Sequence, residues 1–314
     1  MKLTVFLCIL AILKGKQRDW RQPVPADEEE ADMLKLWIVG ASGQIGSAIN
    51  EVLDPLEMEV FNTDKEELDI TDTDEVLNFG VINRPDVIIN CAAVTDTDLC
   101  EKEPELAYRV NALGARNLSI VARKIGAKMV QISTDDVFDG IRHTPYTEFD
   151  DTNPKTVYGR SKRAGENYVK EFTHKHFILR SNWVYGNGNN FVNRVLHAAD
   201  TKDELLIASD QFGSPTSAKD LAKMIMYLIS TNEYGTYHVT CQGVCNRYEF
   251  AQEVLKLAGK RITLRPVVTS ESDLSSARPA YAVLDNFILR IINVYEMPDW
   301  RASLKEYMDE RMED

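Results

Sequence analysis

The sequence predicts an α/β protein built on a doubly wound parallel sheet. From Leu34 onward, short and nearly continuous apolar segments alternate regularly with amphipathic segments. This alternation is typical of a parallel sheet that helices cover on both faces. A glycine-rich turn, Gly40–Gly46, follows the first apolar segment, where such folds bind nucleotides. With 314 residues, the chain is long enough for one large or two modest domains.

The first half of the chain contains four predicted strands and one long predicted helix. Ligands of a doubly wound sheet bind at the carboxyl ends of its strands, so the residues that follow each strand are the first candidates for a site. The helix has apolar residues at helical spacing over its whole length. The predicted strands are 36–39, 58–63, 86–93 and 127–134, and the helix is 104–125.

The glycine-rich turn is predicted to hold the pyrophosphate of a dinucleotide. Glycines permit backbone conformations and close approaches that a side chain would block. The helix that follows offers free N–H groups and the positive end of its dipole to an anion. A plain turn between a strand and a helix remains the alternative. The residues expected to contact the cofactor here are Gly40, Gly43, Gln44, Ile45 and Gly46.

Asp64 ends the second predicted strand, 18 residues after Gly46. A carboxylate near this distance accepts hydrogen bonds from the adenosine ribose and repels the 2′-phosphate of NADP(H), so NADH is favoured over NADPH. The alternative is an aspartate that caps a turn, with the charge of Lys65 offsetting its own. Asp69 and Ile70 follow where an acidic and an apolar group would flank adenine.

Thr134, Tyr158 and Lys162 form the candidate catalytic set. Tyr158 and Lys162 are four residues apart in a helical segment, so both side chains project from one face. An ammonium group beside a phenol stabilises the phenolate and makes the phenol a usable proton donor near neutral pH. Thr134 reaches the same crevice from the end of a strand and can bond the reacting oxygen. Without the glycine turn, this Tyr-Lys spacing would indicate only a pair on a helix surface.

Charge and cysteine content exclude several classes of function. The 36 Lys and Arg residues against 49 Asp and Glu residues give a net charge of −13 without a basic stripe, so no nucleic-acid partner is expected. An odd number of scattered cysteines indicates reduced thiols in a cytoplasmic protein. No second cysteine pair or histidine cluster accompanies the last two cysteines, so no metal site is expected. The five cysteines are Cys8, Cys91, Cys100, Cys241 and Cys245.

Residues 1–33 are interpreted as an N-terminal extension and linker. The apolar run 3–13 begins like a secretory signal, but basic residues and no small-residue cleavage site follow it. The run is also too short to cross a bilayer as a helix. We therefore expect no membrane association.

From about Leu34 to its C-terminus the chain resembles the extended short-chain dehydrogenase/reductases and, within them, the dTDP-4-dehydrorhamnose reductases. The glycine turn and the YxxxK segment mark the whole superfamily, whereas the later segments look like this particular reductase. The segments that carry the resemblance are GASGQIG (Gly40–Gly46), NCAAVT (Asn90–Thr95), ISTDDVFDG (Ile132–Gly140), YGRSK (Tyr158–Lys162), RSNWVYG (Arg180–Gly186), NNFV (Asn189–Val192), DQFGSPT (Asp210–Thr216) and ARPAYAVLDN (Ala277–Asn286).

The resemblance implies an NAD(P)H-dependent oxidoreductase that reduces the C4 ketone of dTDP-4-dehydro-β-L-rhamnose to dTDP-L-rhamnose, a nucleotide sugar used in cell-wall polysaccharide. Tyr158 would protonate the developing C4 alkoxide, Lys162 would tune Tyr158 and hold the nicotinamide ribose, and Thr134 would polarise the carbonyl. A homodimer is one assembly that the resemblance allows. The implied domains are a Rossmann-type dinucleotide-binding domain, residues 34–181 plus about 216–244, and a smaller interleaved α/β substrate domain, residues 182–215 plus about 245–314.

The resemblance also assigns residues to the two ligands. Ala92, Ala93 and Thr95 would line the cofactor groove, and Trp183 would flank the sugar. For Asn190, Gln211 and Arg278 a hydrogen bond that fixes a loop is the alternative role. The further candidates for the sugar or nucleotide end of the substrate are Asp135, Asn190, Gln211 and Arg278.

Asp136 departs from the family pattern, which reads Ser-Thr-Asp-Tyr-Val-Phe. A carboxylate in place of a phenol removes a stacking surface and a hydrogen-bond donor, unless the residue points away from the pocket. The choice of sugar is therefore less certain than the type of reaction. Two alternatives stay open: an epimerase or dehydratase of nucleotide sugars that retains NAD, and a regulatory subunit that binds the cofactor without turnover.

Overall fold

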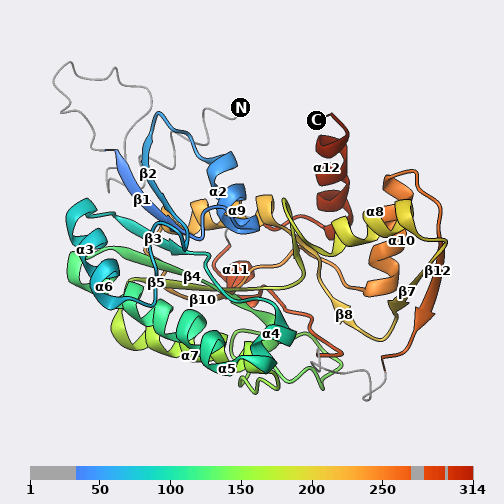
Figure 1. Ribbon diagram of the computed structural model, residues 1–314, viewed down its shortest axis with the longest axis horizontal. Helices are drawn as coiled ribbons and strands as arrows, with labels where there is room; N and C mark the ends of the chain where they lie inside the picture. Colours follow the sequence, from blue (N-terminus) through green and yellow to red (C-terminus); the bar gives the residue numbers. More distant parts are fainter. Residues whose placement is uncertain (1–32, 270–278, 294–295, 314) are drawn as a thin grey trace.

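The central feature of the molecule is a six-stranded parallel sheet with the strand order β10-β5-β4-β3-β1-β2 (Figure 1). This computed structural model describes residues 33–269, 279–293 and 296–313, so all but the last residue of the expected extension 1–33 lies outside the described residues. The strands are β1 (Leu34–Val39), β2 (Met58–Thr63), β3 (Val87–Asn90), β4 (Lys128–Thr134), β5 (His176–Ser181) and β10 (Gly235–His238).

The predicted fold class is confirmed by this topology. After β1 the chain adds β2 on one side and then β3 on the other, so the direction of winding changes between β1 and β3. Ligands of doubly wound sheets bind in the crevice above such a switch point. Asn90, the last residue of β3, pairs with Gln131, so β4 continues three residues further, to Thr134. Thr134 pairs in turn with Ser181, the last residue of β5.

Alternating residues of the strands face two different helical layers. Leu36 and Ile38 belong to the core on the side of α2 (Gln44–Val52) and α9 (Ala218–Ile229). Trp37 and Val39 belong to the core on the side of three other helices. Figure 1 shows these two layers on opposite faces of the sheet. The helices of the second layer are α3 (Thr73–Asn83), α6 (Ala115–Ile125) and α7 (Val157–Phe172).

The helix predicted at 104–125 is interrupted by wide turns in the structure. It consists of α5 (Pro104–Tyr108), the π-helical segment η1 (Arg109–Gly114) and α6. Within η1, the side-chain oxygen of Asn111 accepts a hydrogen bond from the backbone N–H of Val94 at 2.8 Å. The side-chain nitrogen of Asn111 donates to the carbonyl oxygen of Val94 and to the hydroxyl group of Ser161, both at 3.0 Å. The wide turn therefore holds a buried asparagine between α7 and the segment after β3, and such turns often occur beside functional sites.

Most of the remaining elements belong to the second half of the chain and lie to one side of the sheet, whereas α4 (Thr97–Lys102) packs against α5 and α7 (Figure 1). Trp300, Leu304 and Met308 lie on one buried face of α12, as expected for a helix that closes the core. The elements are α4 (Thr97–Lys102), η2 (Asp135–Val137), β6 (Val184–Tyr185), α8 (Phe191–Thr201), β7 (Glu204–Ala208), β8 (Phe212–Gly213), β9 (Thr216–Ser217), β11 (Cys245–Asn246), α10 (Arg247–Leu257), β12 (Thr263–Val267), α11 (Phe287–Ile291) and α12 (Trp300–Glu313). No helix in the described ranges is long and apolar enough to cross a membrane.

The glycine turn packs directly on the backbone that follows β3. Gly40 has a φ of +76°, and a Cβ atom on it would lie 2.7 Å from the nitrogen of Ala92. A Cβ atom on Gly46 would overlap the carbonyl oxygen of Gly40. Both positions therefore require glycine, and Gly40 requires it for conformation as well as for space.

We predict that Gly40→Ala destabilises the protein more than a glycine replacement that adds strain alone. Gly126, with a φ of +81° and nothing within 4 Å of the added Cβ atom, is the matched control. Gly126→Ala should cost about 1–2 kcal/mol of unfolding free energy. Gly40→Ala should cost roughly 1–3 kcal/mol more, because the methyl group meets the backbone of Ala92. Equal losses in urea denaturation would contradict the packing described for the turn.

Candidate active site

A cavity of about 610 Å³ lies in the crevice at the carboxyl ends of the strands. Its walls come from the glycine turn, the ends of β3, β4 and β5, the face of α7 and the loops of the second half of the chain. The structure thus brings together residues that are up to 240 positions apart in the sequence. The predicted site residues among those that line it are Gly43, Gln44, Ile45, Ala93, Thr95, Thr134, Asp135, Tyr158, Lys162, Trp183 and Gln211.

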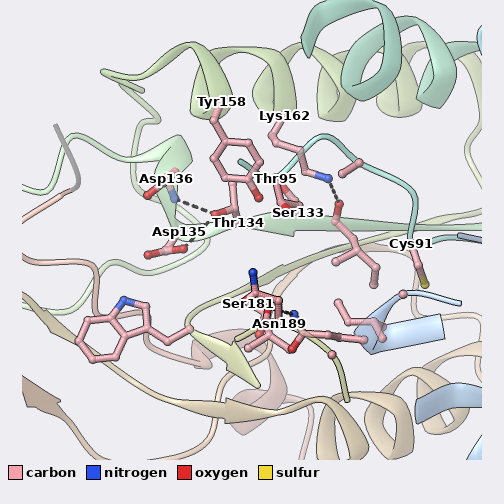
Figure 2. Close-up of a pocket in the computed structure, with 18 of the residues that line it drawn as sticks. Cys91, Thr95, Ser133, Thr134, Asp135, Asp136, Tyr158, Lys162, Ser181 and Asn189 are labelled. Carbon is pink, nitrogen blue, oxygen red and sulfur yellow. Dashed lines mark hydrogen bonds between the residues drawn. The ribbon is translucent and has the colours of Figure 1, made fainter. Parts of the chain in front are cut away.

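Tyr158 and Lys162 project from α7 toward the strand that carries Thr134 (Figure 2). Tyr158 is 9% exposed and Lys162 is 4% exposed. The ammonium group of Lys162 donates a hydrogen bond to the carbonyl oxygen of Ile132 at 2.7 Å. Burial lowers the pKa of Lys162 to about 8, while the negative charge of Glu166 acts in the opposite direction. The lysine is therefore held in place beside the tyrosine and can exchange a proton near neutral pH.

Thr134 lies opposite this pair in a short chain of hydrogen bonds. Its hydroxyl group donates to the carboxylate of Asp135 at 2.9 Å and accepts from the backbone N–H of Asp136 at 3.1 Å. The other oxygen of Asp135 accepts a hydrogen bond from the side chain of Asn182 at 2.7 Å. The Thr134 hydroxyl group is thus oriented at the cavity wall by the turn η2 and by β5.

A buried ion pair lies directly behind these residues. Glu166 is on α7, one turn after Lys162, and accepts two hydrogen bonds from Arg180 of β5, both at 2.8 Å. It also accepts a hydrogen bond from the hydroxyl group of Ser133, the neighbour of Thr134, at 2.7 Å. Burial alone would raise the pKa of Glu166, but the bonds from Arg180 and Ser133 outweigh it and hold that pKa below its usual value. The catalytic helix is therefore tied to the ends of both strands.

Four predicted cofactor residues lie around the turn instead of on the cavity wall. Gly40, Gly46 and Ala92 form the close backbone packing beneath it. Asp64, at the end of β2, accepts hydrogen bonds from the backbone N–H of Ser42 at 3.0 and 3.2 Å, so its carboxylate also stabilises the turn.

The pair predicted to flank adenine is divided by the structure. Ile70 is 6% exposed and packs in the core beneath α6, close to Gly114. Asp69 is exposed, and its carboxylate accepts a hydrogen bond from the backbone N–H of Thr71 at 2.9 Å. This bond, with the nearby charges of Lys65 and Arg109, holds the pKa of Asp69 below its usual value.

One predicted substrate residue of the described ranges, Asn190, does not line the cavity. Asn190 caps α8: its side chain accepts from the backbone of Asn193 at 3.0 Å and donates to the carbonyl oxygen of Gly186 at 2.6 Å. Its neighbour Asn189 lines the cavity instead, and the carbonyl oxygen of Asn189 accepts a hydrogen bond from Gln44 at 3.4 Å. Arg278 lies outside the described residues.

The structure also shows residues that the sequence did not single out. Asn111, Glu166 and Arg180 act behind the catalytic set, and no local pattern connects them because their partners are distant in the chain. Arg247 lines the cavity from the start of α10. Asp136, 3% exposed, contributes to the cavity wall beside Thr134, so the departure from the family pattern lies at the site.

The fold and this site define a dinucleotide-dependent oxidoreductase of the short-chain dehydrogenase/reductase class. The glycine turn lies at the switch point of a doubly wound sheet, and a buried Tyr-Lys pair faces a strand-end threonine across the same cavity. Within the described residues, no group of three or more His, Cys, Asp or Glu side chains is arranged to hold a metal ion.

Comparison with known proteins gives the family. Residues 34–312 match the family described as RmlD substrate binding domain. The chain is 40% identical over 280 residues to the spore coat polysaccharide biosynthesis protein SpsK of Bacillus subtilis, covering 89% of this chain and 98% of SpsK. The crystal structure of a dTDP-4-dehydrorhamnose reductase from Clostridium acetobutylicum is 44% identical with a TM-score of 0.87, covering 88% of this chain and 99% of the other.

A second solved relative carries a cofactor. The dTDP-4-dehydrorhamnose reductase of Bacillus anthracis, solved in complex with NADP, is 42% identical with a TM-score of 0.87, and the match covers 88% of this chain and 99% of that chain. The chain described here therefore belongs to the RmlD family of dTDP-4-dehydrorhamnose reductases.

The buried position of Lys162 predicts a specific pH dependence of stability. The pKa of Lys162 is about 8 in the folded state and about 10.5 when it is not buried. Between these values the unfolded chain binds the extra proton, so a rise in pH stabilises the folded state. The unfolding free energy of the wild type, measured against Lys162→Met, should therefore rise between pH 8 and 10.5 by on the order of 3 kcal/mol.

Urea denaturation at a series of pH values measures this difference. Lys124 is exposed on α6, so Lys124→Met is the control and should follow the wild type across the same range. Parallel stability curves for the wild type and Lys162→Met would contradict the lowered pKa.

Proposed function

We propose that this protein reduces the C4 ketone of dTDP-4-dehydro-β-L-rhamnose with NAD(P)H and forms dTDP-L-rhamnose. The observation that carries the proposal is that Thr134, Tyr158 and Lys162 line one cavity with the glycine turn. Two relatives above 40% identity that match nearly their whole length are named as reductases of this keto-sugar, which supports the same substrate.

The glycine turn fits the pyrophosphate of a dinucleotide. Gly43 begins α2 without a side-chain cap, and the first turn of α2 contains no acidic residue, so its N–H groups and dipole are available to an anion. Gly43, Gln44 and Ile45 would hold the phosphates, while Ala93 and Thr95 would line the groove toward the nicotinamide. When bound, NAD(P)H supplies the hydride that reaches C4 of the sugar.

Three residues of this chain would supply the proton to the C4 oxygen and stabilise the charge that develops on it. As the C4 oxygen gains negative charge, the phenol of Tyr158 donates its proton to that oxygen, which completes the hydroxyl group. The charge of Lys162 stabilises the phenolate left on Tyr158. The hydroxyl group of Thr134 has one proton, which it donates to Asp135 in the structure; with substrate bound, it turns from Asp135 to donate to the same oxygen and orients the ketone.

The substrate contacts belong to this proposal. Trp183 would flank the sugar, and Gln211 and Asp135 would bond its polar groups. For Asn190 the capping of α8 supports a role in shaping the loop next to the sugar, and Arg278 keeps its assignment to the nucleotide end. We also infer the two domains 34–181 plus about 216–244 and 182–215 plus about 245–314; the sheet strand β10 and the helix α9 support the first of them.

The cellular setting is proposed as well. The described cysteines Cys91, Cys100, Cys241 and Cys245 are free thiols, which supports a reducing compartment such as the cytoplasm. A homodimer is one assembly that the resemblance allows, and the mass of the protein in solution tests it.

Replacement of the proton donor gives the main test. Tyr158→Phe should lower kcat for the keto-sugar by about 10²- to 10⁴-fold, because general acid catalysis is lost, and should leave the Kd for the cofactor nearly unchanged. Tyr168→Phe, on the same helix but outside the cavity, is the control and should keep full activity. The measurement is the loss of reduced-nicotinamide absorbance with either NADH or NADPH.

The same assay separates the alternatives. If the sugar changes but neither cofactor is consumed, the protein is an epimerase or dehydratase that retains NAD. If Tyr158→Phe causes no functional change, the protein binds the cofactor without turnover, and the reductase proposal is wrong.

Asp64 predicts the choice of cofactor. Its carboxylate lies at the end of β2, where a 2′-phosphate would be repelled, so NADH should be preferred even though the B. anthracis relative was solved with NADP. Asp64→Asn should shift the ratio of kcat/KM for NADPH over NADH upward by roughly tenfold. Asp74→Asn, at an exposed position in the first turn of α3, should leave the ratio unchanged. An unchanged ratio for Asp64→Asn would show that Asp64 serves only to cap the turn.

A further inference from the structure

The cavity is lined by charged groups of both signs, and its two cationic side chains come from different halves of the chain. Within the described residues, its cationic side chains are Lys162 and Arg247 and its carboxylates are Asp135 and Asp136. Lys162 lies next to Tyr158 at the catalytic end and donates to Ile132. Arg247 comes from the other half of the chain, at the start of α10. A ligand with two anionic phosphates therefore meets a cationic side chain, Arg247, on the wall away from the catalytic pair.

Arg247 is held in a defined position on that wall. Its guanidinium carbon lies 3.6 Å from the centre of the Trp183 ring and 4.9 Å from the centre of the Phe191 ring. Its backbone N–H donates to the carbonyl oxygen of Gln211 at 3.1 Å. Asn246 and Glu249 form a reciprocal capping box that fixes the first turn of α10 around it. A stacked guanidinium keeps the N–H donors of its plane directed outward, in the geometry that suits phosphate oxygens.

Trp183 carries backbone strain that supports this position. Its φ is +44°, in the left-handed region that a tryptophan rarely adopts. A Cβ atom on Gly213 would lie 2.6 Å from the Trp183 ring, so only glycine leaves room for the ring there. Strain of this kind persists where the surroundings enforce it, and it is concentrated at binding and catalytic sites. The ring is thus held against the guanidinium of Arg247 at the cavity wall.

We propose that Arg247, stacked on Trp183, binds the diphosphate of the nucleotide-linked sugar. The identity of the ligand rests on the proposed function. The pyrophosphate of the cofactor is assigned to the start of α2, so a second diphosphate needs a separate cationic group. Asp135 and Asp136 repel phosphate from the catalytic end, and Arg247 attracts it to the opposite wall. Asp135, Asp136 and Arg247 together orient the substrate with its ketone toward Tyr158.

Calorimetric titration of the intact protein with dTDP and with thymidine tests the proposal. Arg247→Met should raise the Kd for dTDP by roughly 10- to 100-fold, because charge-assisted bonds are lost, and should change the Kd for thymidine by less than about threefold. Arg247→Lys should recover part of the dTDP affinity. The Kd for NAD(P)H should not change in either variant. The affinity of the wild type for dTDP should also fall more steeply with salt than that of Arg247→Met.

Arg301 provides the matched control. It is an exposed arginine stacked on a tryptophan, 4.3 Å from the centre of the Trp300 ring, and it does not line the cavity. Arg301→Met should leave the affinity for dTDP unchanged. Near-ultraviolet circular dichroism of each variant verifies that its tertiary structure is intact.

Two results would overturn the proposal. In the first, Arg247→Met binds dTDP as tightly as the wild type. In the second, thymidine binding weakens as much as dTDP binding, which would mean that Arg247 supports only the base or the position of Trp183. If dTDP binding depends on Arg247 but the keto-sugar is not reduced, the proposed function fails while the diphosphate contact stands.

Discussion

The buried ion pair between Glu166 and Arg180 is the interaction on which the geometry of the site depends. Glu166 lies on the same helix as Tyr158 and Lys162, and it accepts bonds from Arg180 on β5 and Ser133 on β4. Loss of Glu166 would leave the buried guanidinium of Arg180 without its carboxylate, which is strongly destabilising. Tyr158, Lys162 and Thr134 are thereby held in one rigid unit.

The register of the sheet explains why that unit reaches the cofactor groove. β4 extends three residues past the level at which β3 ends, so Thr134 overhangs the switch point where the glycine turn lies. On the opposite side, the close packing of Gly40 on Ala92 fixes the turn against the strand edge. The cavity between them is therefore formed by backbone packing and buried charges together. In the proposed function, both bring the hydride donor to the carbon atom and the proton donor to the oxygen atom of one ketone.

The parts of this arrangement that local patterns determine were predictable from the sequence. The glycine turn, the strand that precedes it and the spacing of Tyr158 and Lys162 are all encoded within a few residues, and the structure has them as expected. The π-helical turns around Asn111 were not predictable, because the apolar spacing continues through them and their cause is a contact with Ser161, 50 residues away. Long-range pairing explains the other omissions.

Arg247 and the ion pair between Glu166 and Arg180 are features that local sequence patterns did not reveal. A single arginine after a short strand carries no local signal, and only the folded chain places it on Trp183. Asn190 shows the reverse case: an asparagine in a loop rich in Asn and Gly was assigned to the ligand, but it caps α8 and leaves its neighbour Asn189 on the cavity wall. Residue type and spacing identify the loop, whereas the helix that begins there decides which of its residues faces the ligand.

In the proposed function, hydride reaches C4 and a proton reaches the oxygen of the same ketone within one cavity. Transfer of deuterium from reduced cofactor that carries deuterium in both C4 positions of the nicotinamide tests this most directly, with the sugar product analysed by nuclear magnetic resonance. We expect a single deuterium at C4 of dTDP-L-rhamnose and one equivalent of oxidised cofactor. An altered sugar without deuterium at C4, or full retention of the label in the cofactor, would contradict it.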